Sequence, residues 1–120
     1  MATLIWKNKK KRLAIYGRKQ NENMKKTLTI VKVGGKIVED PASLSQLLDR
    51  FSKIEGLKML VHGGGRTATD VAGQLGIETH MVNGRRITDA QMLRVVTMVY
   101  GGLVNKNIVS QFSAMGLRAL

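Results

Sequence analysis

Hydrophobic and polar positions divide the middle of the chain into two short apolar runs separated by an amphipathic stretch. Residues 28–33 (LTIVKV) are rich in β-branched side chains, which is typical of a strand. Residues 58–61 (KMLV) show little alternation, so we expect a strand that is buried on both faces. Glycines follow each run, at residues 34–35 and 63–65. The pattern therefore predicts two strands that each end in a glycine loop.

The stretch between the two runs predicts one helix. Residues 40–43 (DPAS) are typical of a helix start, and Gly56 marks its end. Apolar residues at spacings of three and four give one face that can cover a sheet: Leu44, Leu47, Leu48, and Phe51 or Ile54. The two strands and this helix form a β-α-β unit over residues 28–61. Its crossover should be right-handed, which makes the strands parallel and brings both glycine loops to the same edge of the sheet.

After the second glycine loop the pattern predicts a helix to about Leu75, stopped by Gly76, and then a hairpin. Asn83 and Gly84 stand between two extended runs. A type I′ turn needs positive φ at both of its central residues, so Asn-Gly is the strongest short hairpin signal in the chain.

Two helices and the start of a strand are expected in the last third of the chain. Thr88 and Gln91 match a capping box at the start of a helix that ends near Tyr100. The glycine pair at residues 101–102 predicts a kink or a break, after which a second helix runs to Gly116. The last four residues are typical of the beginning of another strand.

Composition narrows the class of protein. The chain has 120 residues, 43% of them hydrophobic, and it contains no cysteine, so disulfides and thiolate metal sites are excluded. No apolar stretch reaches the roughly 18 residues of a membrane span, and the start lacks the pattern of a secretory signal. These features predict a cytoplasmic protein with one modest core.

The net charge of +12 is unevenly distributed. Residues 1–26 carry nine Lys or Arg against Glu22, whereas residues 27–120 carry eleven basic against seven acidic residues. We expect residues 1–26 to be a basic, disordered extension that adheres to polyanions by charge alone, without specific nucleic-acid binding. Because MKKT at residues 24–27 leads directly into the first strand, we also expect Met24 to be the natural start.

The glycine loops are candidate anion sites. The backbone N–H groups of Gly63, Gly64 and Gly65 can approach a carboxylate or phosphate with no Cβ in the way, and the following helix adds its positive N-terminal end. Lys32, just before the first glycine pair, is either a snorkelling edge residue or an ammonium directed at phosphates. Lys36 is a second, looser candidate.

A possible carboxylate clamp follows the hairpin turn. Arg85 and Arg86 stand there as a pair, and a guanidinium can bind a carboxylate bidentately in a geometry that lysine cannot match. We expect only one of the two arginines to take this role, the other being a solvated edge residue.

Two rival functions remain open on these residues. Gly63-x-Gly65-x-x-Ala68 satisfies the relaxed dinucleotide-binding fingerprint, which would suit an oxidoreductase. That interpretation requires an acid after the next strand, where the chain has the arginine pair instead. A basic polyanion-binding module is the third class, and it rests wholly on residues 1–26.

The order of the motifs is more specific than any one of them. The chain carries VKVGG at 31–35, VHGGG at 61–65, NGRRITD at 83–89 and VNK at 104–106. Over residues 27–120 it thereby resembles the N-terminal part of the acetylglutamate kinases, within the amino acid kinase family. The resemblance implies an α/β fold, the N-terminal half of a three-layer sandwich with a mostly parallel sheet.

The reaction implied by the resemblance is transfer of the ATP γ-phosphate to the side-chain carboxylate of N-acetyl-L-glutamate, in arginine biosynthesis. Mg²⁺ would enter through ATP, with no metal ligands in this chain. Lys32 would be the catalytic lysine that neutralises charge on the phosphoryl group, and Gly34 and Gly35 would line the ATP phosphates. Catalysis would be positioning and electrostatic stabilisation, with no protein nucleophile.

The same resemblance implies the substrate contacts. Gly64 and Gly65 would bind the acylated amino acid through their backbone, and Arg86 would clamp its α-carboxylate. His62 would shape the loop rather than act in acid-base catalysis, and His80 is expected to be structural. Partners would be a second copy or a higher homo-oligomer in the full-length protein, with no specific nucleic acid and no membrane.

Departures from the family pattern concern length. Family members run to well over twice the 94 residues of this match, and their later part supplies a second lysine, an aspartate and most of the nucleotide pocket. We therefore expect residues 27–120 to be a truncated domain that is inactive alone. The basic extension also differs from the hydrophobic N-terminal helix of some arginine-inhibited relatives.

Overall fold

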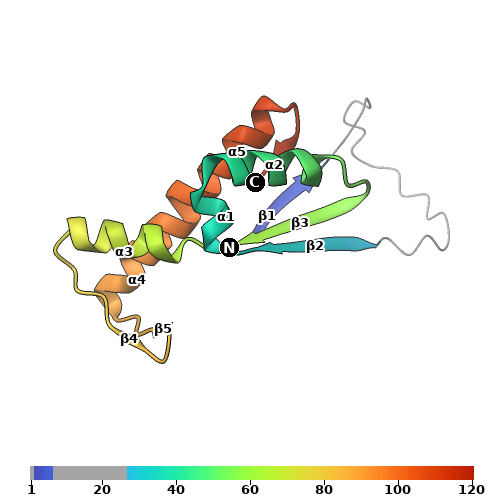
Figure 1. Ribbon diagram of the computed structural model, residues 1–120. Coiled ribbons are helices and arrows are strands. Elements are labelled where there is room, and N and C mark those ends of the chain that lie inside the picture. Colours follow the sequence, from blue (N-terminus) through green and yellow to red (C-terminus); the bar gives the residue numbers. More distant parts are fainter. Residues whose placement is uncertain (1, 7–26) are drawn as a thin grey trace, which may run out of the picture.

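A four-stranded sheet with helices against it forms the centre of the computed structural model, which describes residues 2–6 and 27–120 (Figure 1). The strands, in spatial order, are β2 (Leu28–Val33), β3 (Leu57–His62), β1 (Ala2–Trp6) and β6 (Arg118–Ala119). Helices α2 (Pro41–Ser52) and α5 (Asn105–Ala114) lie over the sheet in Figure 1. The predicted α/β class is confirmed.

The two predicted strands are parallel and in register. Leu28 lies opposite Leu57 at one end of the pair, and Val33 lies opposite His62 at the other. Because the two strands end side by side, the glycines that follow them leave the sheet at the same edge. The predicted meeting of the two glycine loops is thus confirmed.

Strand β1 was not predicted. It lies between β3 and β6 and is antiparallel to both, so β2, β3 and β6 run in one direction and β1 in the other. Sequence analysis assigned no regular structure to residues 1–26, and β1 is a difference from that expectation. The expected disorder over residues 7–26 and the expected start at Met24 lie outside the described residues.

Helices cover one face of the sheet (Figure 1). Along β3 the side chains of Lys58, Leu60 and His62 are buried, whereas Met59 and Val61 are only half-buried. Side chains of a strand alternate between its two faces, so this pattern marks one covered face and one more open face. The prediction of a strand buried on both faces is therefore wrong for the described part of the chain.

Local signals explain the start of α2. Asp40 is its N-cap and accepts a hydrogen bond from the backbone N–H of Ser43 at 2.8 Å, while Pro41 occupies the first turn, where its missing N–H costs nothing. Hydrogen bonds from Ser43 lower the pKa of the Asp40 carboxyl, because they favour its charged form. A short helix before it, α1 (Gly35–Glu39), was not predicted.

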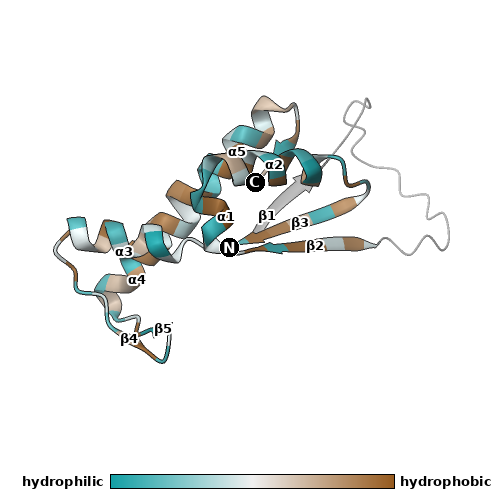
Figure 2. Ribbon diagram, in the orientation of Figure 1, coloured by the Kyte–Doolittle hydropathy of each residue, from teal (hydrophilic) through white to brown (hydrophobic). Residues whose placement is uncertain are grey.

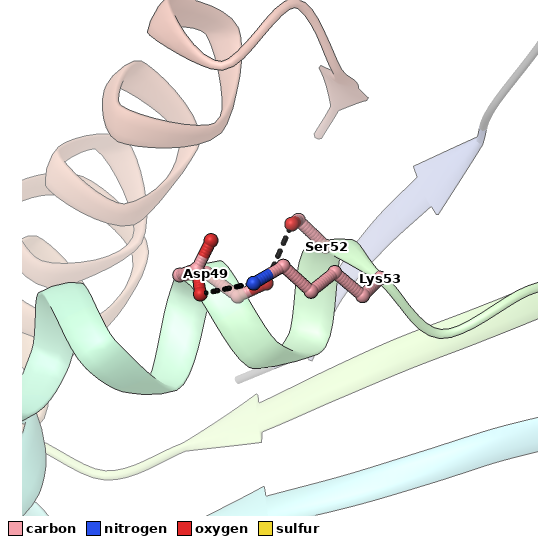
Figure 3. Close-up of polar contacts among 3 residues, drawn as sticks. All are labelled: Asp49, Ser52 and Lys53. Carbon is pink, nitrogen blue, oxygen red and sulfur yellow. Dashed lines mark hydrogen bonds and ion pairs between the residues drawn. The ribbon is translucent and has the colours of Figure 1, made fainter.

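The end of α2 is held by a buried lysine. Lys58 from β3 is fully buried, and its Nζ donates to the carbonyl oxygens of Phe51, Ser52 and Ile54 at 2.8, 2.7 and 2.7 Å. These carbonyls have few partners at a helix C-terminus, where a cation is also favoured by the dipole. On the exposed side of the same turn, Lys53 pairs with Asp49 at 2.7 Å (Figure 3).

The hairpin and the helix before it agree with prediction. Helix α3 (Gly65–Gln74) ends before Gly76, and β4 (Met81–Val82) pairs with β5 (Arg85–Arg86). Asn83 and Gly84 both have positive φ, at 49° and 73°, as a type I′ turn requires.

The last helices differ from prediction in two details. Helix α4 (Ala90–Thr97) is capped by Asp89, which accepts from the N–H of Met92 at 2.8 Å, so the capping box at Thr88 is wrong. At residues 101–102, where a kink or break was predicted, the α-helical pattern is interrupted but the chain stays helical. The glycines lie within η1 (Met98–Val104), a π-helical stretch that continues directly into α5.

The core lies between the covered face of the sheet and helices α1, α2 and α5, and it continues through η1 to α3 and α4. Phe51 of α2 and Phe112 of α5 bring their ring centroids to 5.6 Å. Figure 2 shows hydrophobic residues along β2 and β3, while the visible outer side of α2 is largely hydrophilic. The buried hydrophobic residues are Val33, Val38, Leu44, Leu48, Phe51, Leu60, Ala68, Ala72, Met92, Val95, Val99, Val104, Ile108 and Phe112.

Candidate active site

The two glycine junctions touch at the edge of the sheet. A Cβ built on Gly63 would lie 3.7 Å from the backbone nitrogen of Gly35, and one built on Gly35 would lie 4.0 Å from the nitrogen of Gly65. These distances are ordinary van der Waals contacts, so the backbones of the two junctions pack directly against each other. The parallel register thus converts two separate sequence motifs into one surface of backbone groups.

Gly64 is enclosed by the π-helical stretch. A Cβ at this position would meet Val104 Cγ2 at 3.1 Å and two ring carbons of Tyr100 at 3.3 Å, and the phenol oxygen of Tyr100 reaches to 3.7 Å from a Cβ on Gly65. Tyr100 therefore forms a wall of the loop. Sequence analysis missed this role, since nothing local signals that a helix of a distant segment will pack on the glycines.

The side chain of Arg86 is hydrogen-bonded to the second glycine loop. Its Nη2 donates to the carbonyl oxygen of Gly65 and to Thr69 Oγ1, both at 2.6 Å. Its Nε and Nη1 are buried without a hydrogen-bond partner among the described residues. Arg85, in contrast, is exposed. The structure thus distinguishes Arg86, which contacts the loop and Thr69, from the exposed Arg85; the contact with Thr69 was not predicted.

Lys32 lies near the end of β2 and is exposed. It pairs in register with Val61, which directly precedes the His62 and Gly63 junction. Gly34, two residues later, is the N-cap of α1, and its carbonyl oxygen accepts from the N–H groups of Ile37 and Val38. Lys32 and Gly34 therefore lie at the edge where the glycine loops meet, while no contact joins Lys32 to Arg86.

A carboxylate of the chain occupies the amino end of α3. Oε1 of Glu39 accepts hydrogen bonds from the backbone N–H groups of Arg66 at 3.1 Å and Thr67 at 3.2 Å. Sequence analysis expected an anionic ligand at this helix end and did not consider Glu39. No sequence signal identifies it, because its partners lie 27 and 28 residues away.

His62 is buried behind the glycine loop. Its Nδ1 lies 3.0 Å from the carbonyl oxygen of Gly63, which can only accept, so Nδ1 carries the proton. Burial lowers the pKa of His62, and the hydrogen bond to Gly63 opposes this shift in part. The imidazole is thus neutral near pH 7, as suits a side chain that shapes the loop. His80 is exposed, with its Nε2 at 3.6 Å from Glu78.

The described residues contain neither a cluster of metal-ligating side chains nor a helix suited to span a membrane. In residues 2–6 and 27–120 no three His, Cys, Asp or Glu side chains gather as a metal would require. None of the helices in that part of the chain has the length and apolar character needed to cross a membrane.

A profile of the amino acid kinase family matches residues 27–120. The chain belongs to this family. Among curated relatives, an acetylglutamate kinase of Bacteroides fragilis is 68% identical over 99 residues, and one of Phocaeicola vulgatus is 69% identical over 97 residues. A more distant acetylglutamate kinase, from Methanopyrus kandleri, is 38% identical over 93 residues.

The matches cover most of this chain but only a minor part of each relative. The matches include 82%, 81% and 78% of this chain, respectively, but the chain spans only 38%, 38% and 35% of the relatives' own lengths. Family membership supports a kinase over the oxidoreductase alternative. The polyanion-binding alternative rests on residues 1–26, most of which lie outside the described part of the chain.

Proposed function

We propose that this chain carries the substrate-binding part and one phosphate-facing lysine of an acetylglutamate kinase. In the proposed reaction the side-chain carboxylate of N-acetyl-L-glutamate attacks the γ-phosphorus of ATP, the bond to ADP breaks, and an acyl phosphate forms. Such a step would serve arginine biosynthesis. The names of the relatives support this reaction class.

The proposal rests on the hydrogen bonding of the Arg86 guanidinium. Two protein oxygens hold its Nη2 beside the glycine loop, while Nε and Nη1 are buried without a partner among the described residues. An unpaired buried donor is costly, and a charged one more so. A ligand carboxylate would offset that cost. The α-carboxylate of N-acetyl-L-glutamate fits this requirement, received at Nε or Nη1.

The other proposed contacts follow the two glycine junctions. Gly64 and Gly65 would bind the acylated amino acid through the backbone, where Tyr100 leaves no space for a side chain on Gly64. Gly34 and Gly35 would line the ATP phosphates, and Lys32 would neutralise charge on the phosphoryl group in transfer.

The rest of the nucleotide site would lie in the part of the relatives that this chain does not span, so we propose that residues 1–120 alone do not turn over ATP. Mg²⁺ would enter with ATP as part of the substrate. The full-length protein would act as a homodimer or higher homo-oligomer.

A chimera tests the proposed function. Residues 27–120 are joined to the portion of the Bacteroides fragilis relative that they do not match, and ADP release is followed with Mg²⁺-ATP and N-acetyl-L-glutamate. We expect turnover that requires the acetylated substrate and is absent with unacylated L-glutamate. Hydroxylamine trapping should detect the acyl phosphate.

The parent relative and the isolated chain are the controls. A folded chimera without turnover, under conditions in which the parent is active, would contradict the proposed function. Robust turnover by residues 1–120 alone would contradict the proposed division of the site. A series of N-acyl-glutamates then distinguishes an acetyl-specific enzyme from one that takes a bulkier acyl group.

A further inference from the structure

The amino end of α3 has no cap of its own. Its N-cap is Gly64, which has no side chain to accept a hydrogen bond, and a Cβ there would press on Tyr100 and Val104. The N–H groups of Arg66 and Thr67 belong to the first turn, where no carbonyl within the helix can accept from them. A capping group for α3 therefore has to come from elsewhere in the chain.

Glu39 supplies that cap from the other glycine junction. Its Oε1 accepts from the N–H of Arg66 at 3.1 Å, from the N–H of Thr67 at 3.2 Å and from Thr67 Oγ1 at 3.4 Å. Glu39 is the last residue of α1, the short helix that begins at Gly35. One side chain thus joins the helix that follows the first glycine pair to the helix that follows the second.

The surroundings of Glu39 restrict how it can be replaced. A Cβ on Gly35 would lie 3.6 Å from Oε1, so the carboxylate packs directly over the first glycine pair. Lys36, Glu39, Asp40 and Arg66 line a cavity of about 210 Å³, with two cations and two carboxylates facing it. Among these charged groups, the Glu39 carboxylate makes the hydrogen bonds to the α3 amides.

We infer that Glu39 is a positioning residue that locks the two glycine junctions together and closes the amino end of α3 to outside anions. The positive end of a helix is a ready anion site. With this end filled by the chain's own carboxylate, a ligand anion is directed to the glycine backbone and Arg86. Only this last step rests on the proposed function.

The test uses the ¹⁵N-labelled 120-residue chain and no nucleotide or acylated glutamate. Hydrogen exchange and chemical shifts of the Arg66 and Thr67 amides are compared in wild type, Glu39→Ala and Glu39→Gln. Glu55→Ala is the matched control, since Glu55 is exposed and its loss changes the net charge equally. Each protein is then titrated with sodium sulfate against sodium chloride at equal ionic strength.

Glu39→Ala should speed exchange of the two amides by roughly tenfold or more, since a lost hydrogen bond to a charged group corresponds to about 1.5–3 kcal/mol. The vacated helix end should then show a saturable shift of both amides with sulfate. Glu39→Gln keeps an oxygen acceptor and should restore protection without sulfate binding. Wild type and Glu55→Ala should show neither change.

Three results would overturn the inference: unchanged exchange in Glu39→Ala, saturable sulfate binding at these amides in wild type, or loss of protection in a folded Glu39→Gln. If Glu39→Ala does not fold, the exchange and sulfate titrations of Glu39→Gln and wild type still test the inference. This experiment contains no kinase ligand, so a negative result would not bear on the proposed kinase function. Likewise, an inactive chimera would not bear on the role of Glu39.

Discussion

Nη2 of Arg86 donates to the carbonyl oxygen of Gly65 at 2.6 Å, which ties the β4–β5 hairpin to the first turn of α3. This contact orients a guanidinium whose Nε and Nη1 are still without partners among the described residues. The hairpin thus acts as a support for one side chain at the glycine loop.

Arg86→Lys in the chimera should raise KM for N-acetyl-L-glutamate by roughly tenfold or more and leave kcat within about threefold. In the proposed complex the α-carboxylate would be remote from the transferring phosphoryl group, so its clamp would contribute equally to the ground and transition states. Steady-state kinetics measure both constants. Arg85→Lys, at the exposed neighbour, is the control and should change neither; equal losses in kcat and kcat/KM for Arg86→Lys would contradict the clamp.

Lys32→Ala should have the opposite effect on the chimera. We expect kcat to fall by on the order of a hundredfold with little change in KM for N-acetyl-L-glutamate, because a positive charge at the phosphoryl group acts mainly in the transition state. Lys36→Ala is the comparison, since Lys36 is the other lysine near the first glycine pair. A larger loss of kcat in Lys36→Ala would transfer the role to that residue.

Gly64→Ala should destabilise the 120-residue chain by about 1–3 kcal/mol, because the added methyl would overpack against Val104 and Tyr100. Gly73→Ala, near the C-terminal end of α3 with nothing within 4 Å of its Cβ, should instead stabilise by about 0.5 kcal/mol. Urea unfolding measures both. If the two variants shifted stability in the same direction, the packing around Gly64 would be misjudged.

Lys58→Met should cost on the order of 2 kcal/mol of unfolding free energy, because three carbonyl oxygens at the end of α2 lose their donor. The methionine keeps most of the buried stem, so the loss reports on the ammonium. Lys53→Met, at the C-cap of α2, is the matched control. Its pair with Asp49 is exposed and should contribute about 0.5 kcal/mol or less. Equal effects would argue against a structural role for the buried lysine.

His62 should make the chain less stable as the pH falls. Its folded-state pKa lies below the ordinary value of 6.5, so the unfolded chain binds a proton more readily than the folded one. The unfolding free energy should therefore decline from about pH 7 down to the lowered pKa and lose no more from this group below it. His62→Gln should flatten that slope in urea titrations at several pH values. His80→Gln, at the exposed histidine, should leave the slope unchanged.

Local and periodic features were readable from sequence because their causes are local. The apolar stripe of α2, the cap at Asp40 and the Asn83–Gly84 turn each depend on residues within a few positions of one another. The parallel pair was predictable for a similar reason, since a β-α-β unit has few alternatives. The candidate anion loop also followed from a short motif, whereas the choice of Arg86 over Arg85 came only from the resemblance to the acetylglutamate kinases.

Tertiary structure decided which groups complete the loop. Glu39 caps α3, and Tyr100 packs against Gly64, because the fold brings together segments that are distant along the chain. Such contacts leave no periodic pattern in the sequence. The place of β1 in the sheet was likewise set by strand pairing between distant segments. The sequence by itself determined the β2-α2-β3 unit, the hairpin and the glycine junctions. Glu39 and Tyr100 close these junctions because burying and pairing groups across the fold is favourable.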